Sequence, residues 1–427
     1  DRELKFDDGF TSLNARALSA DASADDAPKV HTMLFGNGRL FVVTRDGTIR
    51  CFSSADDVTA PPTHSLPTVE KVVARNDHAA IVDRVANQHG YGVVLGVNDH
   101  RLIEQLVRQT KLKLVVVDPD HAVIEHLRRN LDATGLYGDR VAAIVGSFDS
   151  LELPPYFADV VVSETPDRLI KQLSASAIPR MLKVLRPFGG QLILATGVAQ
   201  QRAFLQTADD QISGLQIDQS LQQLVVTRAG ALPGSSNYTG GWQHSPDENV
   251  RFPLGVLWFD DSLGHFKRSP QPKFVDGVMV SYPKDWHAPR IRGVYTVDYP
   301  LLSPVLSDAY TGRVFDDAEQ AAVRKTLVET DPEKREPSQY RPPYQTDAWK
   351  PAQPRSGKRV NPLTGLEEER VFPKTYGCDG GVDYGQLYSM RSGTAAFYDK
   401  TIESGTVFIS GPRSGCTNSI IPANGLL

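Results

Sequence analysis

The chain has 427 residues, of which 40% are hydrophobic and 23% are charged, and its net charge is −5 at pH 7. This length is enough for two or three domains, and this composition is that of a globular protein. The weak negative charge excludes a general attraction to nucleic acid or anionic lipid, and no stretch of about 18 to 20 apolar residues predicts a membrane span.

The first part of the chain has two contrasting segments. Residues 1–30 are polar and rich in Ala, Asp and Ser, and we expect a flexible arm there. In residues 31–66, apolar runs flank the turns Gly36-Asn37-Gly38 and Arg45-Asp46-Gly47 before a linker rich in Pro, Ser and Ala. Asn-Gly and Asp-Gly between alternating apolar runs are strong hairpin signals, so this segment predicts antiparallel β structure.

Residues 67–230 alternate between helical and strand patterns. This alternation predicts a parallel sheet with helices on both faces. The first helix is expected over residues 69–88, and helices of about 10 to 18 residues are expected between the strands. The expected strands are 92–95, 112–117, 141–145, 159–162 and 191–195, followed by a closing hairpin at 215–218 and 223–227.

Short strand patterns bounded by Gly or Asp return in residues 231–427 and are typical of all-β structure. Within this region, residues 331–372 are rich in Pro and charged side chains and contain few large apolar residues, so we expect a long exposed loop there. The order β, α/β, β predicts that an α/β domain is inserted in one β domain.

Four features of the α/β segment carry a resemblance to a known family. They are the Gly96 turn, VVVDPD at 115–120, GSFDSLELPPYFADVVVSE at 146–164 and LRPFGGQLIL at 185–194. These features resemble the class I S-adenosylmethionine-dependent methyltransferases, whose sheet also ends with an antiparallel strand. The resemblance implies a Rossmann-type sheet and S-adenosylmethionine as the cofactor.

The resemblance also assigns roles to residues by position. Gly96 and Asn98 match the loop against the amino-acid portion of the cofactor, Asp118 matches the acid that holds the ribose hydroxyls, and Ser147, Phe148 and Asp149 match the turn beside the adenine. Asp118 follows Gly96 by 22 residues, close to the roughly 20 expected for ribose recognition. Glu164 falls where family members often place groups that contact the substrate.

Structural explanations for the same residues stay open. Gly96 serves a strand-to-helix turn whether or not anything binds, Asp118-Pro119-Asp120 can simply cap the next helix, and Phe148 can be a core residue. The family's further glycines would fall at positions 98 and 100, where this chain has Asn98 and His100. Their side chains add bulk in the loop that the cofactor approaches.

The flanking β segments resemble the repeats of pyrroloquinoline-quinone-type β-propellers. The resemblance rests on GRLFVVTRDGTIRCFS at 38–53 and LSDAYTGRVF at 306–315, with Asp308, Thr311 and Gly312 at the matching positions. Asp316 stands where the repeat has Trp. The resemblance implies a propeller that carries a methyltransferase-like insertion, an arrangement associated with large exported proteins of planctomycete-type bacteria. The quinone itself is not expected, because adjacent cysteines are absent.

The chain has three cysteines, Cys51, Cys378 and Cys416, and none forms a CxxC pair, so no metal site is predicted. Cys378 and Cys416 are candidates for a disulfide in an oxidising compartment, and three separate thiols are the alternative. A periplasmic or exported location and a cytoplasmic location both stay open.

We therefore expect a multi-domain protein in which a methyltransferase-like α/β domain (67–230) is inserted between propeller-like β regions (31–66 and 231–427). The altered glycine loop favours a binding or scaffold protein without catalysis, whose partner is an unidentified small molecule or protein. An active methyltransferase of unknown acceptor is the alternative, and a quinone-dependent dehydrogenase-like protein is the second alternative.

Overall fold

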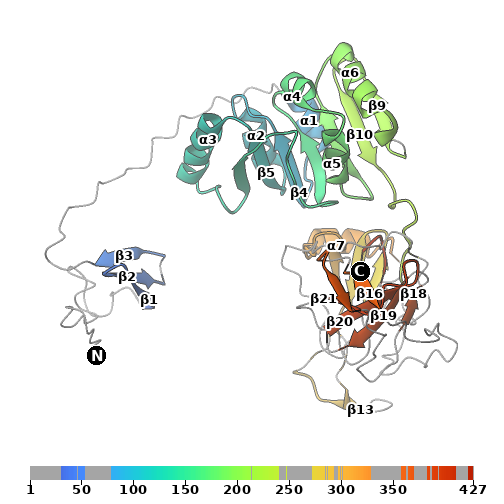
Figure 1. Ribbon diagram of the computed structural model, residues 1–427. Helices are drawn as coiled ribbons and strands as arrows, with labels where there is room; N and C mark the ends of the chain where they lie inside the picture. Colours follow the sequence, from blue (N-terminus) through green and yellow to red (C-terminus); the bar gives the residue numbers. More distant parts are fainter. Residues whose placement is uncertain are drawn as a thin grey trace. The chain divides into compact units, whose positions relative to one another are not determined.

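The chain forms two compact units, Asp1–Leu66 and Pro67–Leu427 (Figure 1). The computed structural model describes residues 30–45, 47–52, 78–212, 214–239, 247, 272–283, 285, 287–292, 297–298, 300, 302–327, 357–361, 364–369, 382–384, 387–392, 394–409 and 422–426. Within these residues, no helix has the length and apolar character needed to cross a membrane.

The first unit contains a small antiparallel sheet. Its strands are β1 (Val30–Gly36), β2 (Arg39–Thr44) and β3 (Ile49–Phe52), which pair in chain order as predicted. Cys51 lies on β3 as an exposed free thiol. The predicted arm and the predicted Cys378–Cys416 disulfide lie outside the described residues and stay predictions.

A mixed sheet of seven strands dominates the second unit. Its strand order is β6-β5-β4-β7-β8-β10-β9. Strands β4 to β8 are parallel to one another, whereas β10 runs antiparallel to both β8 and β9. The predicted parallel sheet and closing hairpin are therefore confirmed. The strand bounds are β4 (Tyr91–Leu95), β5 (Lys113–Asp118), β6 (Val141–Val145), β7 (Ala158–Val162), β8 (Gly190–Leu194), β9 (Gln216–Gln219) and β10 (Leu224–Arg228).

Helices cover both faces of this sheet (Figure 1). Val94 and Val116 pack with α1 (Ala79–Arg84), α2 (Arg101–Gln109) and α3 (His121–Ala133). Val93 and Leu95 point the other way and pack with α4 (Pro166–Gln172), α5 (Ala177–Lys183) and α6 (Val198–Ala208), which a 3-10 turn, η2 (Asp209–Ile212), follows. Because both faces are covered, the inner strands are almost continuous apolar runs.

The helix predictions need three corrections. The predicted length of 10 to 18 residues is too long for α2, which has 9 residues, and for α4 and α5, which have 7 each. The connection between β6 and β7, residues 146–157, contains no helix. Pro154 and Pro155 lie in this segment, and proline lacks the N–H that a helix interior requires and disfavours helical backbone in the residue before it. The first helix ends at Arg84, four residues earlier than predicted, and the part predicted before residue 78 lies outside the described residues.

The C-terminal region is β-rich, as predicted, but its strands form separate small antiparallel sheets. Within the described residues none of these sheets closes into a ring, so a propeller is not shown. The sheets are β11 (Lys273–Val275), β12 (Val278–Ser281) and β15 (Val305–Asp308); β13 (Ile291–Arg292) and β14 (Val297–Asp298); β16 (Lys358–Val360) and β17 (Glu367–Glu369); and β18 (Val382–Tyr384), β19 (Leu387–Ser392), β20 (Thr394–Asp399) and β21 (Val407–Ile409). One helix, α7 (Asp317–Val323), follows β15.

The long loop predicted over residues 331–372 is wrong in part, because strands β16 and β17 lie inside it. The buried side chain of Arg359 accounts for this hairpin. Its guanidinium pairs with Glu368 across the two strands and donates to the backbone carbonyls of Ser404 and Thr406. A hairpin with little apolar content is thus anchored by a charged group whose donors are satisfied.

Candidate functional site

The candidate site lies at the carboxyl edge of the parallel strands, where the loops after β4 and β7 meet. Strand β4 lies between β5 and β7 in the sheet. From β4 the chain continues outward through β5 to β6 on one side, and from β7 it continues through β8 on the other. Open α/β sheets bind ligands at such a switch point. Gly96 and Glu164, two of the residues singled out by the sequence, begin these two loops.

Gly96 is in the left-handed region, with φ +86°. Its N–H donates to the carbonyl of Val117 at 2.8 Å. A Cβ atom at this position would overlap the hydroxyl group of Thr165, which belongs to the loop after β7. The close packing of the chain on itself therefore requires glycine at position 96.

The carboxylate of Glu164 occupies the loop after β4. One of its oxygens accepts hydrogen bonds from the backbone N–H groups of Asn98 at 2.7 Å and His100 at 3.3 Å. The other accepts from the N–H of Leu102 in the first turn of α2 at 2.9 Å. These donors are the groups with which a helix N-terminus binds anions. Burial raises the pKa of Glu164, although the three hydrogen bonds act in the opposite direction.

His100 keeps the backbone conformation of the glycine that it replaces. Its φ is +66°, and as the N-cap of α2 it makes no side-chain capping hydrogen bond. The carboxylate of Glu164 performs that capping from the loop after β7. The His100 ring lies 5.3 Å from that of His126, and burial, together with His126, lowers the pKa of His100.

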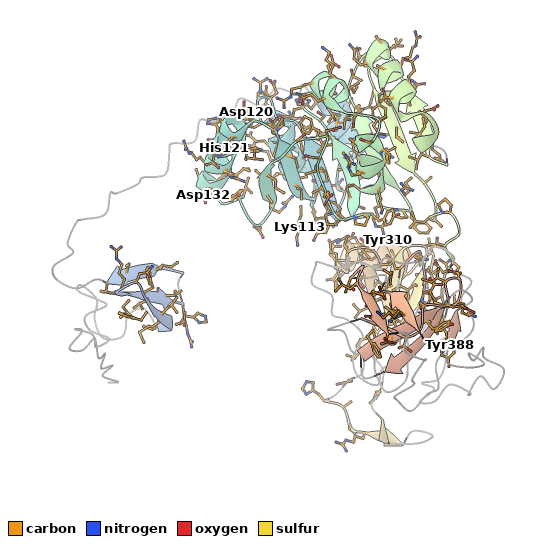
Figure 2. The ribbon with its side chains drawn as sticks, in the orientation of Figure 1. Lys113, Asp120, His121, Asp132, Tyr310 and Tyr388 are labelled. Carbon is orange, nitrogen blue, oxygen red and sulfur yellow. The ribbon has the colours of Figure 1, made fainter. Side chains whose placement is uncertain are left out.

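Asp118, the residue predicted to hold the ribose, is fully buried and already paired. One carboxylate oxygen accepts from the N–H of Asp120 at 2.9 Å. The other accepts from the N–H of Val97 at 2.8 Å and from the guanidinium of Arg168 on α4. Neither oxygen is exposed to a ribose hydroxyl in this arrangement. The alternative prediction of helix capping applies to Asp120, whose side chain caps α3 at His121 (Figure 2).

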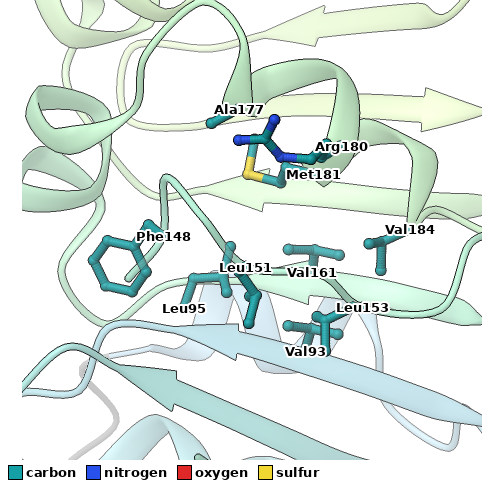
Figure 3. Close-up of a pocket in the computed structure, with 10 residues that line it drawn as sticks. All are labelled: Val93, Leu95, Phe148, Leu151, Leu153, Val161, Ala177, Arg180, Met181 and Val184. Carbon is teal, nitrogen blue, oxygen red and sulfur yellow. The ribbon is translucent and has the colours of Figure 1, made fainter. Parts of the chain in front are cut away.

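Phe148 is 6% exposed and belongs to the apolar core, as its structural explanation proposed. The guanidinium of Arg168 lies 5.8 Å from the centre of its ring. Figure 3 shows Phe148 at the end of a narrow cavity between the sheet and α5, which also contains Leu95 and Met181. The cavity has a volume of only about 20 Å³, which is enough for about one water molecule. It is therefore too small for an adenine.

The two polar residues beside Phe148 have local roles. Ser147 accepts a hydrogen bond from the N–H of Asp149 at 3.2 Å, and Asp149 accepts one from the N–H of Ser174 at 2.9 Å. The hydrogen bond from Ser174 lowers the pKa of Asp149. The backbone carbonyl of Asp149 also accepts from Arg180. These contacts hold the turn against α5.

Two groups of His and acidic side chains have ligand atoms within 4.8 Å of one another in the described part of the chain. In the group His78, Asp99 and Glu164, Asp99 pairs with Arg101 and the Glu164 oxygens accept the N–H groups of the loop. In the group His89, Asp316 and Glu319, both acids belong to ion pairs and to the cap of α7. The carboxylates of both groups are therefore already engaged by donors of the same chain.

Sequence reasoning missed Thr165 and Arg168. Both follow Glu164 within four residues, so the loop after the fourth strand contained the decisive side chains. Arg168 lies between the predicted ribose and adenine positions, because it contacts Asp118 and Phe148 at once. Its position on the first turn of a helix that starts at the switch point was the available signal.

No family model matches this chain, and no curated protein matches it. Among solved structures it is similar to a SAM-dependent methyltransferase from Aquifex aeolicus, at 13% identity, 35% coverage of this chain, 88% coverage of that chain and a TM-score of 0.29. It is also similar to N-methyltransferase NodS from Bradyrhizobium japonicum in complex with S-adenosyl-L-homocysteine, at 18% identity, 36% coverage of this chain, 85% coverage of that chain and a TM-score of 0.27. A third similar structure is a SAM-dependent O-methyltransferase from Thermotoga maritima, at 13% identity, 46% coverage of this chain, 85% coverage of that chain and a TM-score of 0.30.

These TM-scores are too low to support an argument, so the description of the fold rests on the strand order and on the antiparallel β10. The α/β sheet is of the methyltransferase type. In the structure described here, the residues that match the family's cofactor contacts are engaged with other parts of the same chain.

Proposed function

We propose that the α/β domain is a non-catalytic, methyltransferase-like domain of a binding or scaffold protein. The observation that supports this proposal is the occupation of the switch point by the chain's own side chains. Glu164 takes the N–H donors of the loop after β4, and Arg168 takes the carboxylate of Asp118. A cofactor would have to displace both groups.

The energetics also favour this proposal. Moving Arg168 away would leave Asp118 buried without its cation, and breaking a buried ion pair costs about 3 to 5 kcal/mol. Withdrawing Glu164 would remove the cap of α2, at a further cost of about 1 kcal/mol. Micromolar binding corresponds to about 8 kcal/mol, so the sum of these costs, about 4 to 6 kcal/mol, would offset half or more of it.

A direct test is calorimetric titration of the full chain with S-adenosylmethionine and with S-adenosylhomocysteine. We expect no heat of binding at millimolar ligand. Micromolar binding that the Asp118→Ala variant abolishes would overturn the proposal. Circular dichroism of each variant checks that a missing signal does not come from unfolding.

The active methyltransferase stays the second candidate, because the sheet is of the right type and Asp118 is at the matching position. The Glu164→Ala/Arg168→Ala double variant separates the two candidates. If the wild-type chain does not bind cofactor but this variant does, occlusion is the reason for the lack of binding. An active enzyme would instead bind cofactor as the wild type. The predicted propeller and the quinone-dependent alternative have no supporting observation among the described residues.

A further inference from the structure

One guanidinium, that of Arg186, joins the α/β sheet to the β11-β12-β15 sheet. Its Nε donates to a carboxylate oxygen of Asp308 on β15 at 3.0 Å, and its Nη2 donates to the carbonyl of Gly277 at 3.4 Å. The side chains of Arg186 and Asp308 are only 14% and 5% exposed. Asp308 lies in the segment that resembles the propeller repeat. Its ion pair with Arg186 connects the β11-β12-β15 sheet to the α/β sheet.

A second carboxylate, that of Asp159 at the start of β7, lies at the same guanidinium, 4.0 Å from its Nε. Asp159 accepts one hydrogen bond, from the N–H of Tyr91 at 3.0 Å. Asp308 is better satisfied, because it also accepts from the Thr311 hydroxyl at 2.8 Å and the Tyr310 N–H at 3.2 Å. A buried acid, Asp308, and a half-buried acid, Asp159, therefore share one cation, and Asp159 is the weaker partner.

We propose that Asp159 is a pH-sensitive element of this junction, and that its protonation tightens the attachment of the α/β sheet to the β11-β12-β15 sheet. When Asp159 is ionised, it competes with Asp308 for Arg186 and repels Asp308. When Asp159 is protonated, Arg186 pairs with Asp308 alone and the repulsion disappears.

The direction follows from the surroundings of Asp159. Burial raises its pKa to about 6, against the opposing effect of Arg186 and with a further increase from Asp308. Arg313 also faces it, but that guanidinium is held by Glu319 through two hydrogen bonds of 2.7 and 2.8 Å. A carboxyl group with a raised pKa stabilises the folded state at low pH, and this contribution is lost as the pH rises through about 6.

Other titratable groups at the junction require a control. His89 lies 3.1 Å from Asp316 and 3.5 Å from Glu319, and Lys111 lies 3.0 Å from Asp316. Histidine side chains in general change charge between pH 5 and 8, so the test needs a control without His89. Tyr310 (labelled in Figure 2) lies at the same junction, but burial raises its pKa far above this range. His89→Gln is therefore the matched control.

The test measures hydrogen exchange at the backbone N–H of Ala309, which donates to the same Gly277 carbonyl that accepts from Arg186. The full-length wild type, Asp159→Asn and His89→Gln are compared at pH 8 and pH 5.5. The asparagine keeps an acceptor for the Tyr91 N–H. A pKa raised from its ordinary value near 4 to about 6 corresponds to about a hundredfold effect on the opening equilibrium that exchange measures. The 26% exposure of the Asp159 side chain makes the expected effect smaller.

We expect Asp159→Asn to exchange about tenfold more slowly than wild type at pH 8 and equally at pH 5.5, whereas His89→Gln keeps the wild-type pH dependence. Equal exchange of Asp159→Asn and wild type at pH 8 would overturn the proposal, as would loss of the pH dependence in His89→Gln. If Asp159→Asn does not fold, His89→Gln still decides, because the histidine at the junction is then absent. The Ala309 protection of this variant, corrected for intrinsic exchange, must change with a midpoint near pH 6, and any other result contradicts the proposal.

Discussion

The hydroxyl group of Thr165 fills the space in which a Cβ atom on Gly96 would lie. Gly96 also has φ +86°, so a side chain there meets both backbone strain and overlap. We expect Gly96→Ala to lower the free energy of unfolding by about 1 to 3 kcal/mol from strain, and by a further 1 to 3 kcal/mol from overpacking. Urea unfolding followed by circular dichroism measures this loss.

Gly135→Ala is the matched control for the preceding experiment. Gly135 has φ +70°, but no atom lies within 4 Å of the position of its Cβ. It should therefore lose only the cost of the left-handed conformation, about 1 to 2 kcal/mol. Equal losses in the two variants would show that Thr165 moves aside and that the loops after β4 and β7 are not tightly packed.

The Asp118–Arg168 pair gives a second prediction. Arg168→Met leaves the fully buried Asp118 with two N–H donors and no cation, so we expect a loss of about 3 kcal/mol in the free energy of unfolding. Asp118→Asn combined with Arg168→Met should recover most of this loss, because the buried charge is gone. A double variant less stable than Arg168→Met alone would refute this account of the pair.

The cap of α7 gives a prediction at acid pH. Hydrogen bonding from the Glu319 backbone and from Lys111 lowers the pKa of Asp316 to about 2. A carboxyl group with a lowered pKa stabilises the folded state above its ordinary pKa, near 4, and this stability is lost as the pH falls through about 2. Protection of the Glu319 amide should therefore fall between pH 4 and 2.

The Asp316→Asn variant should lack this acid-induced loss, since asparagine keeps the capping oxygen without a titrating charge. Asp317→Asn is the control, because Asp317 is exposed in the same turn and makes no capping contact. If Asp317→Asn removes the acid dependence as effectively as Asp316→Asn, the effect comes from the helix dipole and not from the cap.

The cysteines allow a simple count of thiols. Cys51 is exposed on β3, so at least its thiol should react under native, non-reducing conditions. If Cys378 and Cys416 form the predicted disulfide, the count should stay at one after denaturation. Three reactive thiols after denaturation would exclude the disulfide.

Most strands of the α/β sheet were predictable because they are apolar runs bounded by polar turns. Leu112 to Val117 and Val141 to Val145 are examples, and the structure places strands there with bounds that differ by at most one residue. The absence of a helix between β6 and β7 was not predictable from alternation alone, since the local effect of Pro154 and Pro155 overrides the general pattern. The β16–β17 hairpin was missed because Arg359, a buried charge, replaces the apolar core by which strands are recognised.

At the candidate site, the sequence identified the positions but not their partners. Asp118, Phe148 and Glu164 all lie at the switch point, as the spacing implied. Whether the Asp118 carboxylate faces a ligand or Arg168 depends on a contact between residues 50 positions apart, and local patterns contain no information on such a contact. Asn98 and His100 gave the correct indication that the loop is altered, and only the structure explains how the loop remains folded.

Glu164 holds the first turn of α2 from the loop after β7, and this contact has a consequence for protein engineering. A variant in which only positions 98 and 100 became glycine would be more flexible in the unfolded chain and would still have a carboxylate in the loop. Redesign toward cofactor binding would have to begin at Glu164 and Arg168, and only then restore the glycines.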